Sequence, residues 1–107
     1  MKFATFTHLP WPEDNRPGDL YESHTQQVIL AEELGFHSAW IAEHHFTRYG
    51  LGSAPLVIAA NIMARTSKIR IGTAVLVPPL HHPVRLAEEI SVLDVLSGGR
   101  VDAGFGR

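Results

Sequence analysis

The stretch that decides the fold is residues 69–77, IRIGTAVLV. It is β-branched and apolar on both of its faces, which is the pattern of a strand buried from both sides. Two prolines, Pro78 and Pro79, end it. Strands buried in this way belong to parallel sheets that are covered by helices. The stretch therefore predicts an α/β fold built on a parallel sheet.

The same pattern continues in both directions along the chain. Further strands are predicted at 3–7, 36–42 and 100–105. Helices are predicted from Asp19 to about Leu34, from Pro55 to about Thr66, and from Pro83 to Gly98. The strand starts are spaced by roughly 30 residues, the size of a βαβ unit. The order is therefore β-α-β-α-β-α-β.

Specific residues are expected to begin and end these helices. Asp19 and Glu22 have the spacing of a capping box for the first helix, and Ser53 is a candidate N-cap for the second. Gly35 is expected to supply the left-handed turn that ends the first helix. Pro55 falls in the first turn of the second helix, where a missing N–H costs nothing.

Two architectures fit this order of elements. Strands that alternate with helices imply a parallel sheet with right-handed crossovers. One candidate is a doubly wound open sheet, and the other is the first half of a (β/α)8 barrel, whose full form needs about 250 residues. With 107 residues the chain holds at most one domain.

Composition narrows the function classes. The formal net charge is -2, which gives no reason to expect nucleic acid or an anionic membrane as a partner. There are no cysteines, so a disulfide framework, a thiolate nucleophile and a zinc–thiolate site are excluded. The lack of cysteine fits a reducing compartment, and we expect a cytoplasmic location. No apolar run approaches the ~18 residues of a membrane span.

Candidate functional residues follow the strands, because parallel β/α folds bind ligands at the carboxyl ends of their strands. Ionisable or small residues stand at each of these ends: His8 after the first strand; Glu43, His44 and His45 after the second; Ala74, Val75 and the pair His81-His82 at the third; Gly104, Gly106 and Arg107 at the fourth.

The Glu43-His44-His45 run has both a functional and a structural interpretation. Neighbours on an extended segment point to opposite faces, so only one of the two histidines readily faces the mouth of a barrel. The other is expected to pack as a hydrogen-bonded group. Glu43 could orient a histidine or bind backbone amides. A metal site is not expected, because the paired histidines diverge and the chain has no H-E-x-x-H motif.

The ending Gly104-Phe105-Gly106-Arg107 suits a phosphate, since small residues admit the group and a guanidinium binds it bidentately. A solvent-exposed arginine is the alternative interpretation. Asp102, on the fourth strand, could face inward. Arg85 has the spacing to pair with Glu88 and Glu89 on its own helix, and these pairs are assigned no catalytic role.

Three segments together resemble a known family: IAEHHFTRYG, IRIGTAVLVPPLHHPVRLAEEISVLDVLSGGR and VDAGFGR. They are similar to the N-terminal part of the bacterial luciferase-like flavin-dependent monooxygenases, from MKFATF to GFGR. The resemblance implies a (β/α)8 TIM barrel that binds reduced FMN, or in some branches F420, at the C-terminal rim. It also implies O2 and an organic small molecule as substrates, a separate flavin reductase, and a homodimer.

The resemblance assigns roles to five residues and leaves those of others open. His44 matches the family's catalytic histidine, a general acid or base near the flavin. Ala74-Val75 matches a non-proline cis peptide beneath the flavin ring, and Arg107 matches an arginine that binds the flavin phosphate. Glu43 matches a position that lines the flavin site. The roles of His45, His81 and His82 stay open.

The chain departs from the family's light-emitting members and from the family's length. Gly106 stands where the light-emitting catalytic subunit carries a reactive cysteine, which argues against light emission and against an aldehyde substrate. Residues 1–107 are expected to form a single partial domain, the N-terminal half of a barrel, inactive by itself. Two alternatives remain: a non-catalytic half-barrel that self-associates or binds a partner, and a fragment of an F420-dependent oxidoreductase.

Overall fold

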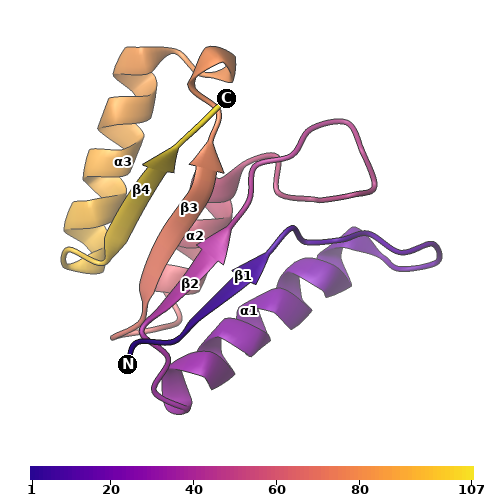
Figure 1. Ribbon diagram of the computed structural model, residues 1–107, viewed down its shortest axis with the longest axis horizontal. Coiled ribbons are helices and arrows are strands. Elements are labelled where there is room, and N and C mark those ends of the chain that lie inside the picture. The colour runs from indigo at the N-terminus through magenta and orange to yellow at the C-terminus, as the bar shows by residue number, and fades with distance from the viewer.

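Four parallel strands form one sheet in the order β1-β2-β3-β4, as the computed structural model of residues 1–107 shows (Figure 1). The strands are β1 (Ala4–Thr7), β2 (Ser38–Ile41), β3 (Arg70–Leu76) and β4 (Val101–Phe105). Between them come helices α1 (Pro17–Glu33), α2 (Pro55–Met63) and α3 (Pro83–Ser97), and a short 3₁₀ turn at Pro78–Leu80 precedes α3. The predicted order of elements is confirmed.

The strand order decides between the two architectures. A doubly wound sheet reverses its strand order at a switch point, whereas a barrel adds each new strand beside the last one. Here the strands follow one another without reversal, each paired in parallel with the next. The sheet is therefore the first half of a (β/α)8 barrel, with β1 and β4 at its edges (Figure 1).

The helices start at prolines and not at the predicted caps. Each of the three α-helices has a proline in its first turn, and no side chain caps any of them. The predicted capping box is wrong: α1 begins two residues before Asp19, and Glu22 binds Arg65 on the neighbouring helix. The hydrogen bonds from Arg65 lower the pKa of Glu22 to about 2. Ser53 is also not the cap of α2, whose flanking residue is Ala54.

The helix ends follow the prediction more closely. Gly35, just after α1, has a φ of +80°, and Gly98, which ends α3, has a φ of +71°. Both angles lie in the left-handed region that glycine adopts without a steric cost. None of the three helices has the length and apolar character that a membrane crossing requires.

The core lies between the helices and one face of the sheet. Alternate residues point to this face: Ala39 and Ile41 from β2, Ile71 from β3, and Ile69, which directly precedes β3. Helix residues that pack against them include Val28, Ala59, Ile62 and Leu93. This packing fixes the register of the strands, and with it the position of the residues that follow each strand.

The opposite face of the sheet carries a row of four paired residues, Phe6, Trp40, Gly72 and Asp102. A Cβ on Gly72 would lie 2.3 Å from the Trp40 ring, so the glycine lets this ring lie flat on the strand. Asp102 receives two hydrogen bonds from Arg70, which lower its pKa. The inner face is therefore apolar and exposed at one end, where Phe6 is 54% exposed, whereas the bidentate ion pair of Arg70 and Asp102 occupies the other end.

Candidate functional site

The Glu43 carboxylate, directly after β2, is the most buried ionisable group at the strand ends. Its side chain has no solvent exposure. Oε1 accepts hydrogen bonds from His45 Nε2 at 2.7 Å and from His81 Nε2 at 2.9 Å. Oε2 accepts the backbone N–H of Val77 at 2.8 Å. One carboxylate thus ties the segment after β2 to both sides of the turn that follows β3.

The hydrogen bonds also set the charge of Glu43. Burial by itself raises the pKa of a carboxyl, but the bonds from His45, Val77 and His81 outweigh it, and the pKa lies below its usual value. The group is therefore an anion at neutral pH. The two possibilities read from the sequence, orientation of a histidine and binding of a backbone amide, are both realised at this carboxylate.

His44 lies apart from this carboxylate, in a cluster with His8 and Tyr49. Its Nε2 lies 3.2 Å from Nδ1 of His8, and the Tyr49 hydroxyl lies 3.5 Å from Nε2 of His8. The three rings pack with centroids about 5 Å apart, the Phe6 ring meeting His8 edge-on at 4.7 Å. As predicted for adjacent residues on an extended segment, His44 and His45 diverge.

Glycines let the loop after β2 fold back onto the end of β1. A Cβ on Gly50 would lie 2.3 Å from the His8 carbonyl oxygen and 3.1 Å from the His44 ring. A Cβ on Gly52 would lie 2.1 Å from the carbonyl oxygen of Ala42. The backbone N–H of Leu51 donates to the carbonyl of Leu9. The fold of this loop brings Tyr49 to His8.

The peptide bond between Ala74 and Val75 is cis, at the position where the resemblance places one. Both residues are half-buried near the end of β3. Gly106 packs against Val75, because a Cβ there would lie 2.5 Å from Cγ2 of Val75. The ends of β3 and β4 thus come into contact at Val75 and Gly106, where the lack of a side chain on Gly106 makes room for Val75.

Arg107 is exposed, and no ion pair of the structure includes it. The structure therefore brings together Glu43 with the end of β3, and Val75 with Gly106. His44 contacts His8 and Tyr49. The catalytic role of His44 and the cofactor-binding roles of Glu43, Ala74, Val75 and Arg107 stay predictions.

Sequence reasoning missed three side chains of this region: His8 and Tyr49 as partners of His44, and His81 as a partner of Glu43. The position of His8 at the end of the first predicted strand was a usable signal. Tyr49 carried none, because its contact with His8 spans 41 residues of chain and depends on the path of the loop.

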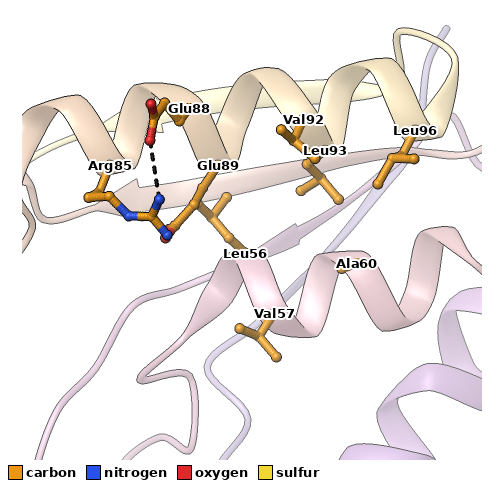
Figure 2. Close-up of a pocket in the computed structure, with 9 residues that line it drawn as sticks. All are labelled: Leu56, Val57, Ala60, Arg85, Glu88, Glu89, Val92, Leu93 and Leu96. Carbon is orange, nitrogen blue, oxygen red and sulfur yellow. Dashed lines mark hydrogen bonds and ion pairs between the residues drawn. The ribbon is translucent and has the colours of Figure 1, made fainter.

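A separate hollow lies on the outer side of the molecule, between α2 and α3 (Figure 2). Its volume is about 620 Å³, and it is lined mainly by apolar side chains, with Arg85, Glu88 and Glu89 at one end. Arg85 forms the predicted pairs with both glutamates, at 3.2 Å and 3.5 Å. The hollow shares no residue with the groups at the strand ends.

The fold and the strand ends together define the class, a half (β/α)8 barrel with a histidine site at the carboxyl ends of its strands. The model of the luciferase-like monooxygenase family matches residues 1–107, so the chain belongs to this family. The predicted family is confirmed.

Two curated relatives illustrate the match. The alkanal monooxygenase alpha chain of the Kryptophanaron alfredi symbiont is 47% identical over 107 residues, which are 100% of this chain and 30% of that protein. The oxygenase component of a flavin-dependent trigonelline monooxygenase from Acinetobacter baylyi is 32% identical over 108 residues, again 100% of this chain and 30% of that one. The chain thus spans about a third of the length of these relatives.

Solved structures agree with the fold. The monooxygenase RslO1 from Streptomyces bottropensis superposes with a TM-score of 0.94 at 37% identity, covering 100% of this chain and 33% of that one. The coenzyme F420-dependent tetrahydromethanopterin reductase from Methanopyrus kandleri superposes with a TM-score of 0.73 at 28% identity, covering 98% of this chain and 26% of that one. The predicted half-barrel is confirmed.

Proposed function

We propose that residues 1–107 are the N-terminal part of a flavin-dependent monooxygenase that uses reduced FMN and O2 to oxidise an organic small molecule. The observation that carries this proposal is the family match over the whole chain. A curated relative that is named flavin-dependent supports the choice of cofactor. The barrel needs further strands to close, so we expect the isolated half to have little or no turnover.

The residues at the strand ends fit a flavin. Ala74 and Val75 are half-buried, and Ala74 is small, so a flat ring system can approach the backbone there. Arg107 is exposed and unpaired by any carboxylate, as a guanidinium that receives a phosphate should be. We assign the ring to Ala74-Val75 and the phosphate to Arg107. A bound reduced flavin supplies the electrons that activate O2.

The roles of the remaining residues follow from their contacts. His44 is half-buried, and an imidazole ring has one nitrogen that can donate a proton and one that can accept it. We propose His44 as the catalytic acid or base. We propose that Glu43 supports the cofactor site by fixing the residues after β3. Its carboxylate accepts a hydrogen bond from the N–H of Val77, at the end of β3, and another from His81, after the following turn.

The role of His44 is tested by His44→Ala in the complete protein. Turnover of reduced FMN and O2 with the organic substrate should fall by about 100-fold or more, the typical contribution of a general acid or base. Flavin binding should persist. Unchanged turnover in the presence of bound flavin would remove His44 from the mechanism.

An F420-dependent oxidoreductase is the second candidate, supported by the likeness to the F420-dependent reductase. Parallel titrations of the complete protein with reduced FMN and with F420 separate the two. A non-catalytic half-barrel is the third candidate. Here the chain would associate with itself or with another protein, or bind flavin, without any turnover.

We also propose a separate flavin reductase and a homodimer for the complete protein. The name of the relative from Acinetobacter baylyi, an oxygenase component, supports the reductase. The apolar hollow between α2 and α3 is a surface on which a second copy could pack (Figure 2). Light scattering on the purified protein measures its mass and tests the dimer.

A further inference from the structure

His8 and Tyr49 form a chain of hydrogen-bonding groups that ends on His44. From the outside inward, the Tyr49 hydroxyl meets Nε2 of His8, and Nδ1 of His8 meets Nε2 of His44. Tyr49 is 59% exposed, whereas both imidazoles are half-buried. These hydrogen-bonded groups therefore connect His44 to solvent through His8 and Tyr49.

The partners in this chain constrain which nitrogen carries each proton. In a neutral imidazole one nitrogen donates and the other accepts, so a bond at one nitrogen fixes the role of the other. A phenol is a good O–H donor, and the Tyr49 hydroxyl has no other partner in the protein. If it donates to Nε2 of His8, then His8 carries its proton on Nδ1 and donates it to Nε2 of His44.

We propose that Tyr49 and His8 hold neutral His44 as the Nδ1–H tautomer, so that His44 presents a proton donor to the reaction. This inference rests on the proposed function, since it concerns the same catalytic histidine. In the structure Nδ1 of His44 has no protein partner, and it is free to face a ligand. His44 thus acts first as a general acid, with His8 and Tyr49 as positioning residues.

No other ionisable group competes for these rings. Glu43, the carboxylate next to His44 in the chain, is occupied by His45 and His81. The guanidinium of Arg48, on the same loop, stacks on the Trp11 ring with 4.6 Å between its carbon and the ring centroid. His8 and Tyr49 are therefore the groups that set the tautomer of His44.

Proton transfer along Tyr49, His8 and His44 can replace the proton that His44 gives up. When His44 gives up its proton from Nδ1, Nε2 takes the proton that His8 holds on Nδ1. Nε2 of His8 then takes the phenolic proton of Tyr49, and the exposed phenolate oxygen takes one from water. The net result is that one proton passes from solvent to the acceptor, and each ring returns to neutrality with its tautomer reversed.

Nitrogen-15 NMR of the histidine side chains tests this proposal directly, because it distinguishes a protonated ring nitrogen from a bare one. In the complete protein, above the pH at which the histidines are charged, His44 should be mainly the Nδ1–H form. His8→Leu removes the donor, and His44 should lose this preference. Tyr49→Phe keeps the ring against His8 and removes only the hydroxyl, and it should shift His44 in the same direction.

His82→Gln is the matched control, because His82 is exposed and its ring has no hydrogen bond in the structure. It should leave the His44 signals unchanged. An Nε2–H form of His44 in the wild-type protein would overturn the proposal, and so would identical His44 signals in wild type and both variants. Binding of reduced FMN, measured on the same samples, reports separately on the proposed function: its absence would sink that function and leave the tautomer result readable.

Discussion

Replacing Glu43 with Gln should loosen the turn after β3. The carboxylate is fully buried, with two hydrogen bonds at Oε1 and one at Oε2. Glutamine keeps a single acceptor oxygen, and its NH2 must face either the N–H of Val77 or the two histidine rings. In the first arrangement the glutamine NH2 and the N–H of Val77 are two donors that face each other. In the second, neutral hydrogen bonds replace the two charge-assisted bonds between the carboxylate and the histidine rings.

The expected cost follows from the strength of these bonds. Hydrogen bonds to a charged group contribute roughly 1.5–3 kcal/mol, against about 1 kcal/mol for neutral ones, so Glu43→Gln should cost about 2–3 kcal/mol locally. Since 1.4 kcal/mol is a factor of ten, the Val77 amide should exchange its hydrogen about 30- to 140-fold faster than in the wild-type protein. Hydrogen exchange followed at this amide measures the effect.

A matched control is Glu22→Gln, which alters an exposed carboxylate that also accepts three hydrogen bonds, two from Arg65 and one from Gln26. It should leave the exchange of Val77 unchanged. The pH dependence gives a second check: because the folded-state pKa of Glu43 is lowered, its stabilisation is complete above the ordinary value of 4.5 and is lost as pH falls through the lowered pKa. A rate within about threefold of wild type in Glu43→Gln would refute the role of this carboxylate.

Three further substitutions have defined outcomes. Gly106→Ala places a Cβ 2.5 Å from Cγ2 of Val75, and this overpacking should cost about 1–3 kcal/mol, measured as a lower unfolding temperature. Gly50→Ala places a Cβ 2.3 Å from the His8 carbonyl oxygen, so the loop must move and the NMR signature of the His8–His44 bond should disappear. His24 is buried with no partner for Nε2, and burial lowers its pKa. Stability should therefore fall as pH drops below the ordinary 6.5, and unfolding temperatures of His24→Leu between about pH 7 and pH 5 should show a weaker decline.

The architecture could be predicted from local pattern because the core requires it. The apolar faces of β2 and β3 pack against helices with the expected periodicity, and each predicted strand lies within two residues of its place. The starts of α2 at Pro55 and of α3 at Pro83 were predicted correctly, whereas the start of α1 and the side-chain caps were not. A side-chain cap and a proline serve the same end of a helix, and for α1 and α2 the sequence offered both. In all three helices a proline stands in the first turn and no side chain caps the N-terminus.

The candidate site was only partly accessible from sequence. Strand geometry separated His44 from His45, and the general position of Glu43 at a strand end was correct. The partners of each group were not predictable, because they come from loops whose path depends on tertiary contacts. Tyr49 reaches His8 across 41 residues, and His81 reaches Glu43 across 38.

Anaerobic titration of the complete protein with reduced FMN tests the central claim most directly. We predict saturable binding at micromolar concentration, weakened about tenfold or more by Arg107→Ala, because a charge-assisted contact to a phosphate contributes roughly 1.5–3 kcal/mol. Glu22→Gln, which alters a carboxylate bonded to Arg65 and Gln26 and to no residue of the proposed flavin site, should bind as the wild type does. If neither reduced FMN nor F420 binds at micromolar concentration, the flavin function proposed for this chain is wrong.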